Sequence, residues 1–323
     1  MAALEASVEQ KADPNRIYDV IVVGAGPAGL TAALYLARFC RSVLVLHDGE
    51  SRTLRIPKTH NAPAYPEGIT GADLIRRMSE HPLRYGAVIE QAEVRAAVRS
   101  AEAFLLTDAQ ERVWRSRALI LATGVRMNEV EMPRELHEAA IGAGVLRYCP
   151  ICDGYEHIGD KIGVIGCDSN GAAEALFLRR YSSDVTLMPL CHPELTAEQQ
   201  AELADAEITI VHGALRELSP KEDRMDVFLE GRDAAMSFDV VYPALGCRPR
   251  TKLAAGLGIE IDEKKQLAGD AMNGTEIAGL FAAGDVLNGL DQISVAIGHG
   301  AVAATHAHNW LRACDQQTLQ AKT

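Results

Sequence analysis

One arrangement of segments occurs twice along this chain of 323 residues, and it limits the fold more than any other feature. It consists of a β-forming apolar run, a turn of small residues, an apolar helical stretch and a second β-forming run. The first copy begins at 18–23 and the second at 161–166. Each copy has the length of a βαβ unit, in which a helix connects two parallel strands. The repetition therefore predicts an α/β protein with two domains of similar plan.

The turn of the first copy has the sequence GAGPAG and lies at 24–29, directly after the strand. In a dinucleotide site Gly24 would allow the tight turn, Gly26 would let the backbone approach a pyrophosphate, and Gly29 would let the helix pack on the strand. The N–H groups that open the helix at 30–39 would then face the phosphates. This context predicts Rossmann-like nucleotide-binding domains, each a three-layer ββα fold; an accidental glycine turn is the alternative.

Three further segments follow β-forming runs and could contact the same nucleotide. Asp48 follows the run at 42–46, at the distance where an acidic residue binds a ribose. His47 could reach the ribose instead, and Asp48 could equally be a solvated turn residue. Ala122-Thr123-Gly124 ends a buried run, and so does Gly284-Asp285. A carboxylate at 285 could accept a hydrogen bond from the ribityl chain of a flavin, or it could cap the following turn.

The run at 51–60 is locally basic. It could contact FAD phosphates, a second flavin or an acidic redox partner, or it could be a solvated loop.

The order of these segments predicts that one domain is inserted into the other. The two repeated units do not include the last β-forming run, which ends in Gly284-Asp285, or the stretch of small residues at 294–310. We therefore assign both segments to the first domain. We expect an FAD-binding domain at 18–126 plus 244–311, and an inserted NAD(P)-like domain at 127–243. Residues 1–17 would form a flexible leader and 312–323 a tail. The two chain crossings would make a hinge.

Composition excludes several classes of function. The formal net charge of −12 argues against a nucleic-acid partner, which needs clustered Lys and Arg. No apolar stretch approaches the roughly 20 residues of a membrane helix. Residues 1–16 contain no apolar core of a signal sequence, so we expect a cytoplasmic enzyme.

Only two of the seven cysteines are close in sequence, Cys149 and Cys152. Their spacing allows a disulfide, and a following helix start would lower the pKa of one thiol. A metal site would need two more ligands, and the sequence contains no second CxxC motif to supply them. Redox chemistry is therefore the better interpretation of the pair, and we expect no metal. The other cysteines are expected to be small buried apolar residues: Cys40, Cys167, Cys191, Cys247 and Cys314.

Taken together, these motifs resemble those of the low-molecular-weight thioredoxin reductases. The resemblance rests on GAGPAG, Ala122-Thr123-Gly124, CPICDG at 149–154, and Gly284-Asp285 followed by Gln292-Ile293-Ser294, and it extends over 18–310. It implies an FAD-dependent disulfide oxidoreductase with tightly bound FAD, a homodimer, and a redox-active disulfide carried by the inserted domain. Its partner would be a thioredoxin-like protein or a small dithiol or disulfide.

The resemblance also implies roles for individual residues. Cys152 would face the flavin ring, Cys149 would exchange with the sulfur of the partner, and Asp153 would be the acid/base that moves a proton at the pair. Asn61 would line the flavin, and the backbone at Gln292 and Ile293 would lie at its pyrimidine edge. The implied cofactor-binding set is Gly24, Gly26, Pro27, Ala28, Gly29, Asp48, Asn61, Ala122, Thr123, Gly124, Gly284, Asp285, Gln292 and Ile293.

The second glycine turn departs from the family pattern. It reads GCDSNG at 166–171, so Asp168 stands where a glycine lets the backbone approach a pyrophosphate. The next turn, at 189–193, contains no Arg or Lys to bind the 2′-phosphate of NADPH. Both departures argue against NADPH as the electron donor.

The chain resembles family members that have lost the nicotinamide site. Among them are ferredoxin-linked reductases, diflavin-linked disulfide oxidoreductases with a second FAD, and dithiol oxidases. An NADPH-dependent thioredoxin reductase, a dithiol oxidase that makes disulfides, and a flavin-bearing redox sensor without turnover remain the alternatives.

Overall fold

The computed structural model describes residues 11–166, 169–188, 195–259, 261, 267 and 275–317. The chain divides into two compact units. The first unit consists of Met1–Ile56, Ile69–Arg126 and Arg248–Thr323, and the second of Pro57–Gly68 and Met127–Cys247. Where the chain passes between them, β7 (Val125–Met127) pairs with β15 (Cys247–Pro249). The leader, the tail and the limits of the FAD-binding and inserted domains remain predictions.

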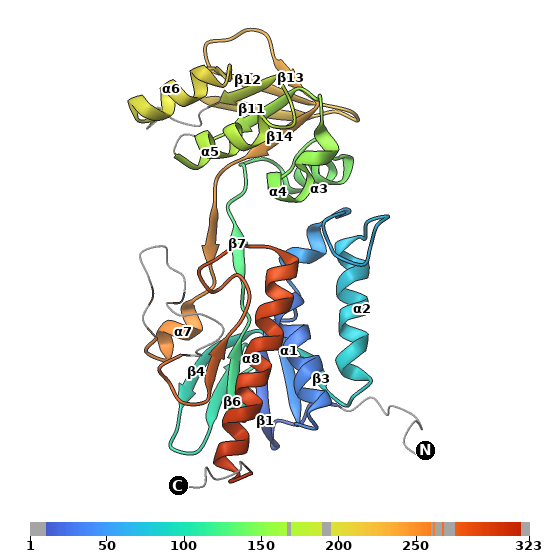
Figure 1. The fold of residues 1–323 in the computed structure, drawn as a ribbon, viewed down its shortest axis with the longest axis vertical. Coiled ribbons are helices and arrows are strands. Elements are labelled where there is room, and N and C mark those ends of the chain that lie inside the picture. Colours follow the sequence, from blue (N-terminus) through green and yellow to red (C-terminus); the bar gives the residue numbers. More distant parts are fainter. Residues whose placement is uncertain are drawn as a thin grey trace, which may run out of the picture. The chain divides into compact units, whose positions relative to one another are not determined.

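A 7-stranded sheet forms the first unit, in the order β3-β2-β1-β6-β5-β4 with β16 beside β6. Five of its strands are parallel: β1 (Ile17–Val23), β2 (Val43–His47), β3 (Val88–Gln91), β6 (Val113–Leu121) and β16 (Leu280–Ala282). Two are antiparallel and form the small meander: β4 (Val94–Arg99) and β5 (Phe104–Asp108). The predicted parallel βαβ unit is therefore present (Figure 1).

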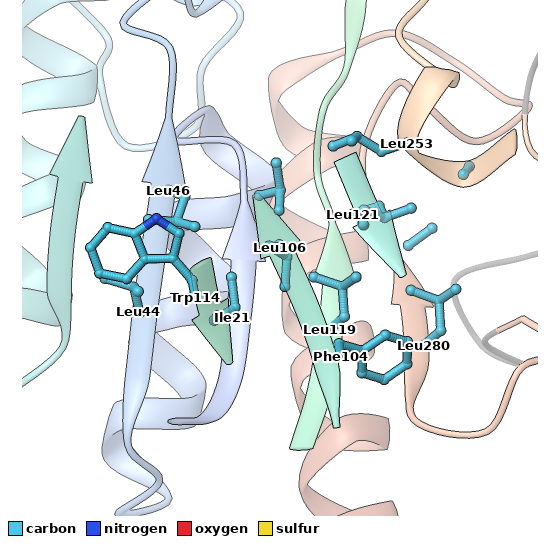
Figure 2. Packing of buried hydrophobic residues seen from close by; sticks show 14 of the residues in the cluster. Ile21, Leu44, Leu46, Phe104, Leu106, Trp114, Leu119, Leu121, Leu253 and Leu280 are labelled. Carbon is cyan, nitrogen blue, oxygen red and sulfur yellow. The ribbon is translucent and has the colours of Figure 1, made fainter. Parts of the chain in front are cut away.

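Both faces of this sheet are buried, because successive side chains of a strand point to opposite sides. Ile21 belongs to the core on one face, together with Trp114 and Phe104, as Figure 2 shows. Val20 and Val22 belong to the core on the other face, where α1 (Pro27–Arg38) and α8 (Ile293–Cys314) pack. The two helices approach closely: a Cβ on Gly300 would lie 2.2 Å from the Ala28 carbonyl oxygen. The other helices of this unit are η1 (Arg52–Arg55), α2 (Gly71–Leu83) and α7 (Lys252–Gly256).

The second unit repeats the plan of the first. Its 4-stranded sheet has the order β10-β9-β8-β14, and all of its pairings are parallel. These strands are β8 (Ile162–Ile165), β9 (Val185–Met188), β10 (Thr209–Ile210) and β14 (Val240–Pro243). A 3-stranded antiparallel meander contains β11 (Leu215–Pro220), β12 (Met225–Leu229) and β13 (Met236–Phe238). The helices are α3 (Arg134–Ala143), α4 (Pro150–Asp153), η2 (Gly154–His157), α5 (Ser169–Leu178) and α6 (Ala197–Asp205). The predicted α/β class with two Rossmann-like domains is confirmed.

One prediction about the cysteines is wrong. Cys40 and Cys314 are exposed and Cys247 is half-buried, although all three were expected in the core. Cys40 lies just beyond the C-cap residue of α1, Phe39, with a φ of 58°, and Cys314 is the last residue of α8. Both therefore lie at helix ends rather than on packed faces. Cys167 and Cys191 lie outside the described residues.

Candidate active site

Four of the predicted segments lie at one edge of the sheet in the first unit. The glycine turn follows β1, Asp48 follows β2, Ala122-Thr123-Gly124 follows β6, and Asp285 comes shortly after β16. Since these strands are parallel, their carboxyl ends meet at the same edge, where open α/β sheets bind ligands. Gln292 precedes the first residue of α8, Ile293, and its carbonyl accepts from the Ala296 N–H.

The three glycines of the first turn meet different surroundings. A Cβ on Gly24 would lie 2.1 Å from the Ala122 carbonyl oxygen, and a Cβ on Gly29 would lie 1.9 Å from the Gly24 carbonyl oxygen. Both glycines are therefore required by packing within the protein. Among the described residues, a Cβ on Gly26 would meet only the Ser51 hydroxyl, at 3.5 Å, so no contact with them requires a glycine there. This open space beside the start of α1 fits a nucleotide pyrophosphate, and hence FAD.

The Asp48 side chain is held by an arginine that sequence reasoning did not identify. The Arg250 Nη1 lies 2.7 Å from Asp48 Oδ2. Burial alone would raise the pKa of the Asp48 carboxyl, but the Glu50 amide and the Arg250 guanidinium lower it overall. Arg250 is itself fixed by its backbone, whose N–H donates to Gly124 and whose carbonyl accepts from the Thr123 hydroxyl. The Asp48 carboxylate and the 123–124 turn are thus connected through one residue.

Asp285 forms a second ion pair at this edge. Arg52 Nη2 donates to Asp285 Oδ2 at 2.8 Å, and Arg52 Nη1 lies 3.8 Å from a carboxylate oxygen of Asp291. Burial raises the pKa of the Asp285 carboxyl to about 6, although the Arg52 charge acts in the opposite direction. Arg52 belongs to the basic run at 51–60, but the sequence did not single it out.

The cysteine pair lies in the second unit as a disulfide between Cys149 and Cys152. Cys149 precedes α4, which begins with Pro150, and the Cys152 N–H donates to the Cys149 carbonyl at 2.9 Å. Proline suits the first turn of a helix because the missing N–H has no partner there. The helix start predicted after the first cysteine is therefore present, and it holds the two sulfurs in bonding geometry.

Asn61 lies in the same unit as the disulfide. Its side-chain amide donates to the Ile151 carbonyl at 3.4 Å, within the CxxC segment. His60 contacts Glu156 of η2, with 2.9 Å between Nδ1 and Oε1. The 57–68 segment therefore contacts the redox segment, while the predicted flavin contact of Asn61 remains a prediction.

Asp153 directly follows Cys152, and its carboxyl group is held from two sides. The Tyr242 hydroxyl donates to Oδ1 at 2.8 Å, and Arg147 Nε lies 3.4 Å from Oδ2. Burial raises the pKa of the Asp153 carboxyl despite the lowering effect of Tyr242, Arg147 and His157. A carboxyl that keeps its proton nearer to neutral pH is suited to general acid catalysis. Sequence reasoning missed Tyr242 because it looks like an ordinary residue of a buried strand.

The second glycine turn is described only in part. A Cβ on Gly171 would lie 2.9 Å from the Gly166 carbonyl carbon, so these two glycines allow α5 to pack on β8 as Gly24 and Gly29 do for α1. Asp168 and the turn at 189–193 lie outside the described residues. The predicted loss of the NADPH site therefore rests on the sequence.

The glycine turn of the first unit and the CxxC disulfide of the second unit together define a class of protein. It is a two-domain flavoprotein disulfide oxidoreductase with a CxxC redox centre. Comparison with known proteins agrees. The family model for pyridine nucleotide-disulphide oxidoreductases matches residues 18–300, and the chain belongs to this family. It is 30% identical over 318 residues to the thioredoxin reductase of Bacillus subtilis strain 168, covering 95% of this chain and 98% of that one.

Solved structures show the same similarity. The crystal structure of HlmI superimposes with a TM-score of 0.86 at 28% identity, covering 93% of this chain and 94% of that one. The thioredoxin reductase from Streptococcus pyogenes MGAS5005 gives a TM-score of 0.84 at 25% identity, covering 93% and 99% of the two chains. The resemblance to thioredoxin reductases that the motifs suggested is confirmed, and FAD is the cofactor expected of the family.

The described residues show neither a membrane span nor a metal cluster. No helix in that part of the chain is long and apolar enough to span a membrane. The same residues contain no group of three or more His, Cys, Asp or Glu side chains placed to hold a metal ion.

Proposed function

We propose that this protein is an FAD-dependent dithiol–disulfide oxidoreductase that does not take electrons from NADPH. The observation that carries the proposal is the difference between the two glycine turns. Gly26 faces open space in the first unit, as a pyrophosphate site requires. The matching position of the second turn is Asp168, whose negative charge would repel a pyrophosphate. The missing basic residues at 189–193 support the same conclusion.

Electrons would then enter at the thiol pair and leave through the flavin. A substrate thiolate attacks Cys149 Sγ, the Cys149–Cys152 bond breaks, and Cys152 leaves as a thiolate. The second substrate thiol attacks the mixed disulfide, the substrate disulfide forms, and Cys149 leaves as a thiolate. The substrate has lost two electrons and the pair has gained them. Bound FAD would supply a two-electron acceptor for the reduced pair. The electrons would finally pass to molecular oxygen or another acceptor, with peroxide as the product where oxygen accepts them.

Asp153 is the acid/base of this exchange in our proposal. A thiolate that departs from a disulfide leaves more readily when a nearby acid protonates it. The raised pKa of the Asp153 carboxyl supports this role, since a carboxyl with a raised pKa keeps its proton to higher pH. The deprotonated carboxylate would next accept the proton of the second substrate thiol.

The remaining assignments are proposals of the same kind. We propose a cytoplasmic homodimer that acts on a thioredoxin-like protein or a small dithiol. A second FAD in the second unit is a further part of the proposal. The amount of FAD released per chain on denaturation tests it: more than one FAD per chain would support a second flavin.

Anaerobic reduction of the flavin tests the function directly. Dithiothreitol should bleach the flavin of the holoenzyme, whereas micromolar NADPH should not. Cys149→Ser should abolish the bleaching by dithiothreitol. With oxygen present, peroxide should form in proportion to added dithiol and only with both cysteines intact.

Rapid and complete bleaching by NADPH would overturn the proposal in favour of an NADPH-dependent thioredoxin reductase. Asp168→Gly is the matched variant: if Asp168 blocks the nucleotide, the variant should be bleached by NADPH faster than the parent. Peroxide formation that does not depend on dithiol would contradict the proposed direction of electron flow.

A further inference from the structure

The Tyr242 hydroxyl is a polar group on an otherwise apolar strand. Its neighbours Val240 and Val241 are fully buried, and so is Tyr242 itself. A buried tyrosine needs a partner for its O–H group. Here the partner is Asp153 Oδ1, at 2.8 Å, on a segment 89 residues away in sequence. One hydroxyl group on this buried strand therefore hydrogen-bonds to Asp153, the residue next to Cys152.

Arg147 approaches the same carboxyl group at its other oxygen. Its Nε lies 3.4 Å from Asp153 Oδ2. The backbone of Arg147 is tied to the strand that carries Tyr242, since its N–H donates to the Val241 carbonyl at 2.9 Å. Its guanidinium also donates to the Ile141 carbonyl at 3.2 Å. Two groups tied to β14 thus flank the carboxyl group: the Tyr242 hydroxyl donates to one oxygen, and the Arg147 charge lies near the other.

We propose that Tyr242 is a positioning residue of the disulfide exchange, which holds Asp153 next to the cysteine pair and sets the pH at which Asp153 gives up its proton. This inference rests on the proposed acid/base role of Asp153. It assigns a function to a hydroxyl that core packing alone does not need, because phenylalanine would fill the same volume.

The direction of the effect follows from the charges around Asp153. A donor to the carboxylate favours the ionised form, so removing the Tyr242 hydroxyl raises the pKa of the Asp153 carboxyl further. The Arg147 charge also favours ionisation, and the Glu156 charge opposes it. Burial and the Asp153 charge together raise the pKa of Tyr242, so its hydroxyl stays protonated and remains the donor.

Asp153 also has access to solvent. It lines a pocket of about 440 Å³ within the second unit, and Arg147 and His157 line the same pocket. The other charged or titratable residues of this pocket are Lys58, His60, Glu156, Asp160, Asp223 and Asp239. A proton lost or gained by Asp153 can therefore exchange with water in the pocket.

The test is the pH dependence of a single-turnover exchange between a small dithiol and the Cys149–Cys152 disulfide of the holoenzyme. In the parent, the rate should fall as Asp153 loses its proton. In Tyr242→Phe, this fall should move to higher pH by about one unit, since a hydrogen bond to a charged group is worth about that much. Tyr18→Phe is the matched control, because Tyr18 is fully buried in the first unit and its hydroxyl accepts from the Asp13 N–H; its profile should not move.

Asp153→Asn separates the two levels of the proposal. In one outcome, Asp153→Asn no longer shows the fall in exchange rate with pH, while Tyr242→Phe shows it at the same pH as the parent. The inference about Tyr242 then fails, and the role of Asp153 stands. If Asp153→Asn retains the fall, the proposed acid/base role itself fails.

A second probe covers the case in which Tyr242→Phe does not fold. Replacement of Tyr242 by 3-fluorotyrosine keeps the ring in place and makes the hydroxyl a stronger donor. The fall in rate should then move to lower pH, opposite to the Phe variant. An unchanged profile would show that the hydroxyl serves packing or folding only.

Discussion

The Arg52 guanidinium donates to the Asp285 carboxylate at 2.8 Å, and this ion pair connects the start of η1 with the segment after β16. Burial raises the pKa of the Asp285 carboxyl to about 6 even with Arg52 in place. The native protein therefore retains a carboxylate that is costly to bury at neutral pH. A group retained at such a cost is a candidate for ligand binding.

Asp285→Asn should stabilise the apoprotein at neutral pH and weaken FAD binding. Below the ordinary pKa of 3.8 the carboxyl is protonated in both the folded and unfolded states, so it costs nothing. Between that value and about 6 the folded state holds the extra proton, so stability falls as pH rises and the full cost is reached above 6. The variant should gain on the order of 2 kcal/mol of unfolding free energy at about pH 7.5, and nothing near pH 3.8.

Urea unfolding of the FAD-free protein at several pH values measures this change, and the FAD content of the purified variant measures binding. Asp48→Asn is the control, because the pKa of Asp48 is lowered rather than raised. Its loss should destabilise the apoprotein at neutral pH. A shift of both variants in the same direction would contradict our account of Asp285.

The glycines of the first turn provide a prediction that separates folding from binding. In Gly26→Ala the new methyl group would meet, within the described part of the chain, only the Ser51 hydroxyl at 3.5 Å, and the φ of Gly26, −83°, is allowed for alanine. The apoprotein should therefore unfold within about 0.5 kcal/mol of the parent, while FAD content falls at least about tenfold. Gly29→Ala should instead destabilise the fold, since its methyl group would lie 1.9 Å from a carbonyl oxygen.

Thermal unfolding of the apoproteins and the flavin absorbance of the purified variants measure the two effects. If Gly26→Ala keeps its flavin, the pyrophosphate does not lie at this turn. If Gly29→Ala folds with the stability of the parent, the close contact between α1 and β1 is not required.

The parts of the fold with strong local signals could be predicted from sequence. The run at 18–23 became β1, extended by one residue at its start. The helix expected at 30–39 is also present, but α1 begins at Pro27, within the glycine motif. The helices α2 and α3 were not predicted. Both are amphipathic, with Leu74 of α2 and Ala140 and Ile141 of α3 buried while most other residues are exposed, so a period of 3.6 residues was present but was overlooked. The helix-breaking residue Pro82 within α2 further obscures that helix in the sequence.

The partners of the site residues could not be predicted for a different reason. Arg52 is 233 residues from Asp285, and Arg250 is 202 residues from Asp48. No periodicity or local motif connects residues so far apart, since their approach depends on which strands are neighbours in the sheet. The sequence indicated the acidic residues because they follow glycine or strand motifs, whereas the arginines stand in segments without such a motif. Sequence reasoning therefore identified Asp48 and Asp285 but not the arginines that hold them.

Asp108 provides the last prediction, and it concerns stability alone. This carboxylate is fully buried at the end of β5, where it accepts from the Trp114 indole at 3.0 Å and from Arg112 Nε at 2.7 Å. The Gln110 N–H donates to it at 2.9 Å. Burial alone would raise the pKa of the Asp108 carboxyl, but these hydrogen bonds lower it overall. Its stabilising contribution is thus present above the ordinary pKa of 3.8 and is lost as pH falls through the lower native value.

Asp108→Asn should therefore lower the unfolding free energy at neutral pH by about 2–3 kcal/mol, because a charged acceptor for several buried donors is removed. The difference from the parent should shrink in acid, where the parent carboxyl becomes protonated. Urea unfolding near pH 7 and in acid measures both values. Flavin content and the rate of bleaching by dithiothreitol, each expressed per folded chain, should match the parent, because Asp108 contacts none of the site residues described above. A variant that kept its stability but lost flavin reduction would place Asp108 in the redox machinery and contradict a purely structural role.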